Sequence, residues 1–253
     1  MKKLLMTIIL VAATIFLFTG CSNKKEISIC DEKRDQIEEK YGVDIFYKES
    51  ETNHNVLDDV KVISDQDELK NALEELENVL SYIPIGFIDE LKNYTKKTIK
   101  IVISESYISG VIFDNKDNEY WVIDKRNIKT CISKNMIYSA FWNINKLDNM
   151  EFLSDWDKYN PKDFRYGNIE EYSQYLFDGN NTYDTYFITK TMMESKYDDI
   201  ECLFSYLWEE EYMKMYNTMS APKIHAKFEY LCSELDRVFE TVDENAYWAR
   251  NIK

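Results

Sequence analysis

The chain has 253 residues, of which 45% are hydrophobic and 30% charged, a composition typical of one folded domain or two small ones. It carries 46 acidic and 31 basic side chains, which give a formal charge of −15. This charge argues against nucleic acid as a partner, because nucleic-acid affinity comes mainly from Lys and Arg that neutralise phosphates. With 6 Gly and 3 Pro, collagen-like and low-complexity chains are excluded.

The first 20 residues have the pattern of an export signal. Lys2 and Lys3 precede an uncharged run over residues 4–19, and the chain turns polar directly after Cys21. This run is shorter than the ~20 apolar residues that a transmembrane helix needs, so we expect a cleaved signal peptide. An uncleaved anchor with an incidental cysteine is the alternative, and both place the following domain outside the cytoplasm on a membrane.

Phe18-Thr19-Gly20-Cys21 resembles the lipobox of bacterial lipoproteins, with Phe18 in place of the usual Leu. The resemblance implies cleavage before Cys21 and acylation of that cysteine through a thioether-linked diacylglycerol, with chains such as palmitate. Two acyl chains hold a protein where one binds only reversibly. We therefore expect a signal peptide at 1–20, a membrane-proximal tether at 21–40, and a lipid-anchored domain at 41–253 on the extracytoplasmic face of the cell membrane.

The remaining cysteines and the two histidines limit the possible chemistry. The cysteine spacings match no Cys-x-x-Cys zinc or redox motif, and we expect buried thiols, although the compartment permits a disulfide. His54 and His225 are the only histidines. No site that needs two histidines on one helix can exist in this chain. The other cysteines are Cys30, Cys131, Cys202 and Cys232.

The first half of the domain alternates predicted helices and strands. Apolar residues at helical spacing follow the capping pattern of Ser64 and Asp67, and Pro84 ends that helix. Runs rich in β-branched and aromatic residues predict strands that form a small mixed or antiparallel sheet. Strands are expected at 43–47, 60–63, 99–103, 107–113 and 119–124, and helices at 31–41, 69–83 and 85–92.

The second half is predicted to be mostly helical, which gives an α+β fold in one domain. Pro222 marks the start of the last long helix. The segment 147–168 is expected to be a long loop that is either functional or packed by its own aromatic residues. Helices are expected from about 131 to 144, at 170–177, at 197–217 and from 222 to about 242.

Three segments in this order resemble bacterial secreted zinc metallopeptidases similar to the catalytic domain of anthrax lethal factor, a gluzincin-type, zincin-like fold. The resemblance covers roughly residues 43–240. The segments are Trp156-x-x-Tyr159-Asn160-Pro161-x-x-Phe164-x-Tyr166, Tyr186-Phe187-Ile188-Thr189 followed by Asp198-Asp199-Ile200-Glu201, and Pro222-x-Ile224-x-x-Lys227-x-x-Tyr230-Leu231.

Active members of that family carry His-Glu-x-x-His on the helix after the sheet, where two imidazoles hold zinc and Glu is the general base. The best register places Asn135, Met136 and Ser139 at those positions. None of the three can do this chemistry. A register shifted by a residue or two changes nothing, because no histidine lies between His54 and His225. The resemblance therefore implies a pseudo-metallopeptidase with no metal or other cofactor.

Asp198, Asp199 and Glu201 lie where family members place a metal-binding or supporting acid. A residual acidic site is one interpretation. A charge cluster at a helix N-terminus, where carboxylates interact favourably with the helix dipole, is the simpler interpretation.

Three functions remain open. The first is a non-catalytic lipoprotein that binds a peptide, a wall fragment or an envelope protein, with Trp121, Trp142 and Trp156 as contacts or as core residues. The second is an active peptidase or other hydrolase with a non-standard site. The third is a purely structural surface lipoprotein. An open groove beside the helix at 133–145 would favour the first over the third.

Overall fold

The computed structural model describes residues 29–47, 60–106, 109–114, 117–147, 150–177, 183–209 and 221–250. The expected signal peptide, Cys21 and His54 lie outside these residues, as does the end of the helix expected at 197–217. Within them, no helix is long and apolar enough to cross a membrane.

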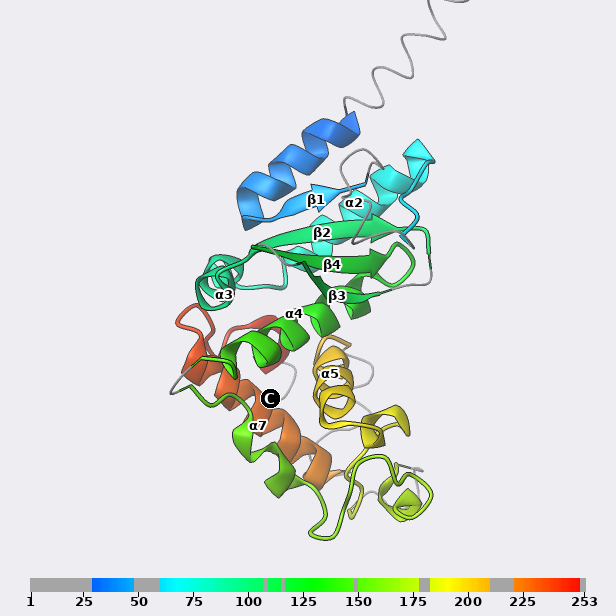
Figure 1. Cartoon of the computed structure of the whole chain (residues 1–253), viewed down its shortest axis with the longest axis vertical. Coiled ribbons are helices and arrows are strands. Elements are labelled where there is room, and N and C mark those ends of the chain that lie inside the picture. The colour runs from blue at the N-terminus through cyan, green and yellow to red at the C-terminus, as the bar shows by residue number, and fades with distance from the viewer. Residues whose placement is uncertain are drawn as a thin grey trace, which may run out of the picture.

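Four strands form one mixed sheet in the order β1-β2-β4-β3 (Figure 1). β1 pairs with β2 in parallel, β2 pairs with β4 in parallel, and β3 pairs with β4 antiparallel, so that β3 is an edge strand. The strand expected at 60–63 is wrong, since only Val62 makes a single bridge to Ser104. The strands are β1 (Asp44–Phe46), β2 (Thr98–Ser104), β3 (Gly110–Phe113) and β4 (Asn118–Asp124).

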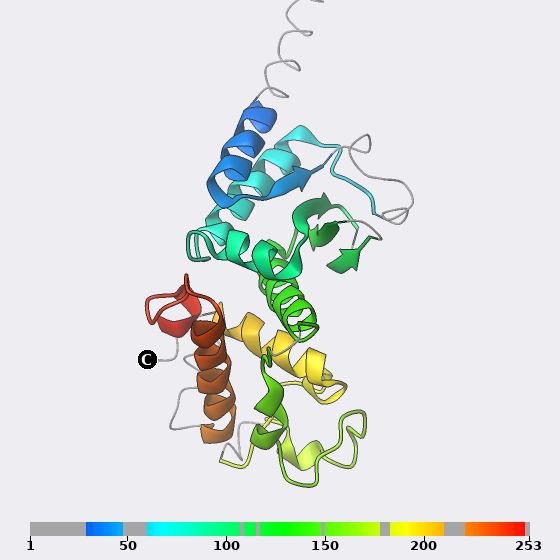
Figure 2. The same ribbon diagram turned by 60° about the vertical axis from the view of Figure 1, so that its left-hand side comes forward.

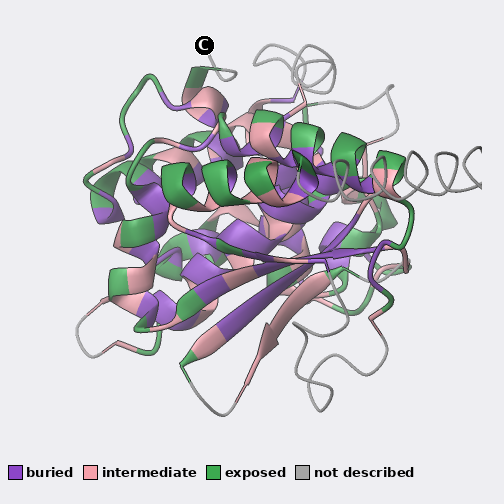
Figure 3. Cartoon of the chain, turned by 90° about the horizontal axis from the view of Figure 1, so that it is seen from above, coloured by how far each residue is buried: buried purple, intermediate pink, exposed green. Residues whose placement is uncertain are grey.

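Alternate residues of the strands face a helical layer. On β2, Ile99, Ile101 and Ile103 are fully buried in the main core, while Val102 belongs to a smaller cluster on the opposite face. This alternation is the period of two that a strand imposes on its side chains. Figure 3 shows helices that are exposed on their outer sides and buried where they meet the sheet.

The helices of the first half cover the sheet. α2 (Gln66–Leu80) begins after Asp65, whose side chain accepts a hydrogen bond from the backbone N–H of Glu68, so the cap is one residue later than the predicted Ser64. α3 (Phe87–Thr95) follows. Residues 29–41 are helical, and their buried Cys30 and Ile37 belong to the core. This part of the expected tether therefore packs onto the domain.

The second half forms a helical layer below the sheet (Figure 2). The helix expected at 170–177 is only a 3₁₀ turn at Ser173–Tyr175, and the expected loop 147–168 contains a 3₁₀ helix at Ser154–Tyr159. A third 3₁₀ turn covers Thr191–Met193. The α-helices are α4 (Ile128–Ile144), α5 (Lys196–Leu207), α7 (Pro222–Val238) and α8 (Tyr247–Arg250).

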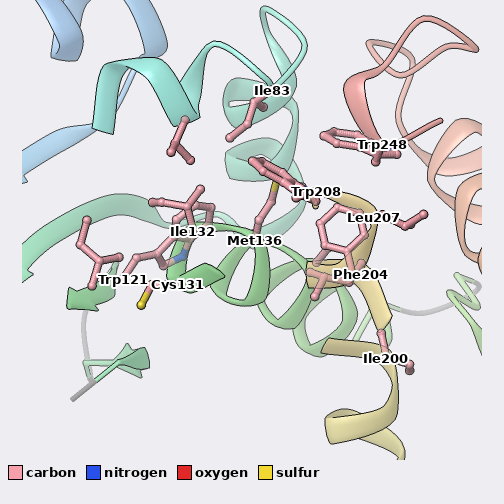
Figure 4. Close-up of a cluster of buried hydrophobic side chains, with 14 of the residues drawn as sticks. Ile83, Trp121, Cys131, Ile132, Met136, Ile200, Phe204, Leu207, Trp208 and Trp248 are labelled. Atoms are coloured by element: carbon pink, nitrogen blue, oxygen red, sulfur yellow. The ribbon is translucent and has the colours of Figure 1, made fainter. Parts of the chain in front are cut away.

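α4 joins the two layers. It contacts β3 and β4 of the sheet, α2 and α3 on one side, and α5 on the other. The buried side chains of Ile132 and Met136 point from α4 into a cluster with Ile83, Trp208 and Trp248 (Figure 4). A single hydrophobic core therefore runs from the sheet through α4 to the C-terminal helices, in agreement with the expected α+β domain.

Candidate functional site

The site predicted from the sequence lies on α4, whose expected motif positions are buried. Asn135 is 3% exposed, and Met136 and Ser139 are fully buried. A catalytic metal site must leave one coordination position open to water or substrate. The side of α4 that carries these three residues offers no such opening.

Asn135 and Ser139 belong to a buried polar network that fastens α4 to β4. The Asn135 side-chain amide donates to the backbone oxygen of Val122 at 3.1 Å. The Asn143 amide donates to a carboxylate oxygen of Glu119 at 3.1 Å and to the backbone oxygen of Ser139 at 2.9 Å. Burial raises the pKa of Glu119, and hydrogen bonds from Ser139, the Trp121 indole and Asn143 oppose that rise.

Glu119 is fully buried, yet its carboxyl group is surrounded by donors, as a buried polar group requires. The indole N–H of Trp121 donates to it at 2.6 Å. Trp121, which was one of three candidate contact residues, is therefore a core residue. The polar residues on this side of α4 hold the helix on the sheet.

The partly exposed side of α4 carries other residues than Asn135, Met136 and Ser139. Lys134, Tyr138, Phe141 and Trp142 are all partly exposed, and their spacing places them on one face of the helix. The rings of Tyr138 and Trp142 are stacked at 6.2 Å with an interplanar angle of 6°. We call these four residues the open face of α4.

α5 lies beside the open face. The Tyr197 ring is 36% exposed and lies 5.9 Å from the ring of Trp142 and 6.1 Å from that of Tyr138. Phe113, on the edge strand β3, lies 6.4 Å from Tyr138. Half-exposed aromatic rings from β3, α4 and α5 therefore meet at one surface.

Two charged groups face each other at the end of this surface. Burial raises the pKa of Glu201 to about 7, and the positive charge of Lys134 opposes the rise. The Lys134 ammonium also donates to the sulfur of Cys202 at 3.7 Å. Glu201 is therefore only partly ionised near neutral pH.

The three carboxylates considered for a residual acidic site have separate roles. Ser195 is the N-cap residue of α5. Its hydroxyl group donates a hydrogen bond to the Asp198 carboxylate, and its oxygen accepts one from the Asp198 backbone N–H. Glu201 faces α4, and Asp199 is fully buried on another side of α5. Asp198 and Asp199 both lie in the first turn of α5, so the helix N-terminal interpretation fits these two carboxylates and not Glu201.

Asp199 forms a buried ion pair that sequence reasoning missed. The Lys227 ammonium donates to it at 2.7 Å, and both side chains are fully buried. The Trp156 indole and the Tyr166 hydroxyl each donate to the same carboxylate oxygen at 2.8 Å. Burial pushes the pKa of Asp199 up and that of Lys227 down, and their mutual attraction opposes both shifts.

This network ties the 150–166 segment to α5 and α7, so Trp156 is a core residue as well. The Lys227 ammonium also lies 4.0 Å from the ring centre of Phe187. The sequence does indicate that Lys227 is buried, because this residue lies on the same apolar stripe of α7 as Ile224, Phe228 and Leu231.

Two surface cavities lie away from the open face. One, of about 550 Å³, lies between the 3₁₀ helix at Ser154–Tyr159 and α7, and Arg237 in its wall is paired with Glu234. The other, of about 360 Å³, is lined by residues 157–166 alone. Neither is an open groove beside α4, the feature that would favour a binding role over a purely structural one.

The described residues do not offer a metal centre. Among them, no three His, Cys, Asp or Glu side chains lie close enough together to hold a metal ion. His225, on α7, lies 3.3 Å from Glu229. The donors on the open face do not fit zinc, because a lysine ammonium has no lone pair to offer and repels the ion. Cys131 and Cys202 are buried free thiols, as expected, whereas Cys232 is only partly buried.

Comparisons with known proteins support the fold. No family model matches the chain, and no curated protein matches its sequence. One solved structure, of a candidate zinc-binding metallo-peptidase from Bacteroides caccae, is similar with a TM-score of 0.52 and 13% identity. The match covers 90% of this chain and 91% of that one. The chain therefore has a mixed α/β fold like that of a metallopeptidase.

Proposed function

We propose that this protein is a lipid-anchored, extracytoplasmic binding protein whose metallopeptidase-like domain has lost its zinc motif and holds peptide or protein segments without cleaving them. The observation that carries the proposal is the open face of α4. That face presents Lys134, Tyr138 and Trp142 at a partly exposed surface where a peptidase of this kind needs metal ligands.

We propose that the lost motif stood at Lys134-Asn135-x-x-Tyr138, a register that the exposure of Lys134 and Tyr138 supports. Two zinc-binding imidazoles must lie one turn apart on an accessible side of a helix. Lys134 and Tyr138 satisfy that spacing on the open face, whereas Asn135 and Ser139 lie against the sheet. This register is shifted by one residue from the one that the sequence alone suggests.

No residue at these positions replaces the lost chemistry. Burial raises the pKa of Tyr138, and the negative charge of Glu201 raises it further, so the phenol keeps its proton. Asn135 has no basic group that could take a proton from water. An active peptidase with a non-standard site would need another cluster, and the three candidate carboxylates do not form one.

The same surface suits an extended peptide. β3 is the edge strand of the sheet, and an edge strand offers backbone N–H and C=O groups with which a peptide can pair. Phe113 of β3 adjoins the ring of Tyr138, which in turn contacts the rings of Trp142 and Tyr197. Half-exposed aromatic rings supply contact area at low cost in conformational entropy.

The anchor is proposed from the sequence. A basic start, an apolar run and Phe18-Thr19-Gly20-Cys21 together support acylation of Cys21 and a location on the outer face of the membrane. The kinship with lethal-factor-like peptidases is also a proposal. It rests on the three ordered sequence segments and on the similar solved structure.

The proposal is tested with the full chain purified from membranes in detergent. We expect substoichiometric zinc after dialysis against a zinc buffer, no cleavage of a mixed peptide library, and retention of a subset of that library on the immobilised protein. Tight stoichiometric zinc with cleavage that a chelator abolishes would establish an active peptidase. Retention of no peptide from the library would favour a purely structural role.

A further inference from the structure

We infer that the cavity walled by residues 157–166 binds a small ligand that carries a carboxylate next to an N–H group, as a free amino acid and the C-terminal residue of a peptide both do. This cavity lies away from the open face, so the inference goes beyond the proposed function and does not depend on it. It also gives a role to the segment from Trp156 to Tyr166, which the proposed function leaves unused.

The cavity has the size and the mixed lining of a small-molecule site. Its volume is about 360 Å³, and such sites occupy roughly 300–1,000 Å³, with apolar walls and a few polar groups. Pro161 and Phe164 are buried and apolar, whereas the polar groups come from other side chains of the same short segment. The polar lining consists of Asp157, Asn160, Lys162, Arg165 and Tyr166.

Two cations in the wall have no acidic partner. Among the described residues, Lys162 and Arg165 form no ion pair, and the Arg165 guanidinium donates to the backbone oxygen of Phe164 at 3.2 Å. Asp157, the acid in the wall, is paired with Lys196 at 3.3 Å. Two unpaired cations on one cavity of a chain with a formal charge of −15 favour an anionic group in the ligand.

Two further acids lie near Arg165 without forming an ion pair with it. Asp163 and Glu171 act together with Arg165 on the pKa of Tyr172, which burial raises. Both acids are exposed, and neither lines the cavity. Water and salt screen exposed charges, with a Debye length of about 8 Å at physiological ionic strength. These acids therefore weaken the positive charge of the cavity without neutralising it.

The wall also holds an acceptor without a donor. The Asn160 side-chain amide donates to the Tyr166 hydroxyl at 2.8 Å, and that hydroxyl in turn donates to Asp199 at 2.8 Å. The Asn160 Oδ1 atom is buried and has no hydrogen-bond partner in the described part of the chain. Buried polar atoms are nearly always hydrogen-bonded, so an N–H group that enters beside Asn160 would satisfy this oxygen.

The walls are held in place from inside the domain. Tyr166 is fixed by Asp199, whose charge is balanced by Lys227. The Phe164 ring is 7% exposed and lies 4.5 Å from the ring of Phe187. A buried ion pair is weak evidence for stability, and in this protein it fixes one wall of the cavity. A ligand therefore meets a site that needs little ordering on binding.

These groups together select a carboxylate with a neighbouring N–H. Lys162 and Arg165 can donate charge-assisted hydrogen bonds to the carboxylate oxygens. Asn160 accepts from the N–H, and Phe164 can contact an apolar side chain. A phosphate offers no N–H and brings a second negative charge toward Asp157. A free amino acid and a peptide C-terminus share the required chemistry, so the test has to separate these two sources.

The test uses four probes with the same apolar side chain, titrated onto the full chain in detergent by ligand-observed NMR. Leucine and N-acetyl-leucine carry both groups, N-acetyl-leucinamide lacks the carboxylate, and 4-methylpentanoate lacks the N–H. We expect the better of the first two to bind about tenfold more tightly than either of the last two. Tighter binding of leucine would identify a free amino acid as the ligand, and tighter binding of N-acetyl-leucine would identify a peptide end.

Variants assign the binding to the cavity. K162Q/R165Q should weaken binding of the better probe about tenfold, because it removes both donors to the carboxylate. K70Q/R250Q is the matched control, since it removes one Lys and one Arg charge from exposed residues of α2 and α8, and it should bind as the parent does. Thermal melts of both variants show whether each is folded.

The inference is overturned if neither leucine nor N-acetyl-leucine binds, if N-acetyl-leucinamide or 4-methylpentanoate binds as tightly as the better of them, or if a folded K162Q/R165Q binds as the parent does. The comparison of probes uses the parent chain, so it decides the question even if that variant does not fold. Retention of library peptides is a separate measurement, and the proposed function stands or fails on that result alone.

Discussion

The register that we propose for a lost zinc motif can be tested by placing two histidines on α4 in each of two ways. K134H/Y138H places them one turn apart on the open face. N135H/S139H places them one turn apart on the side that faces the sheet. The two variants have the same new residues at the same spacing, so they differ only in the environment that the helix gives them.

The expected costs follow from burial. In N135H/S139H, the Val122 carbonyl loses its hydrogen-bond donor, which costs about 1–3 kcal/mol for an unsatisfied buried group. An imidazole at the fully buried Ser139 overpacks the interior and costs a further ~1–3 kcal/mol. A total of about 4 kcal/mol is a large part of a typical domain stability of roughly 5–15 kcal/mol.

In K134H/Y138H, the losses are the contact of Lys134 with Cys202 and the ring stacking of Tyr138, both on a partly exposed surface. We expect a cost of about 1 kcal/mol. With Glu201 across the surface as a third donor, this variant should gain zinc affinity, and zinc at 100 times its Kd should add ~2.7 kcal/mol of stability.

The assay is urea unfolding of both variants and the parent chain, with and without zinc. We expect zinc to stabilise K134H/Y138H alone and N135H/S139H to be strongly destabilised. The reasoning is refuted if N135H/S139H keeps the parental stability and is the variant that zinc stabilises.

Three further predictions concern other parts of the molecule. Lys227→Met should lower the free energy of urea unfolding by about 3–5 kcal/mol, because it leaves Asp199 buried without its cation. K227M/D199L should recover most of that loss. Equal stability of the single and the double variant would contradict this prediction. The pKa of Glu201 is raised from 4.5 to about 7, so the folded parent chain should lose stability as pH rises between these values, by about 3 kcal/mol. E201Q should remove this dependence of the unfolding free energy on pH. Parallel pH profiles of the parent and the variant would contradict the prediction. Cys21→Ser should abolish metabolic labelling with a radioactive fatty acid and release the protein from washed membranes; retention of the label on the variant would disprove acylation at this cysteine.

The sequence predicts α2 well and the faces of α4 poorly, for a physical reason. α2 lies on the surface of the domain, so Leu69, Leu73 and Leu76 mark its single buried side. α4 touches the sheet, α2, α3 and α5. A helix that is buried on several sides has apolar residues nearly all round, and in the middle of α4 only Lys134 indicates which side is open.

The buried ion pair shows a second limit of sequence reasoning. The pattern of α7 predicts its buried stripe, and Lys227 lies within that stripe. A buried lysine requires an acidic partner, but three acids lie close together near the start of α5. Which of them turns inward depends on how α5 rotates against α7 and against Trp156, which periodicity in one helix does not determine.

Under the proposed function, stability and binding use different sides of the same helix. Asn135 and the Glu119–Asn143 contact hold α4 against β4, and none of these groups reaches the open face. Residues on the open face contribute mainly ring contacts at a partly exposed surface. If metal ligands once stood at positions 134 and 138, as we propose, their loss would have cost the fold little stability. The fold therefore tolerates change on this side of α4, and this division of roles is compatible with the peptide-binding surface that we propose.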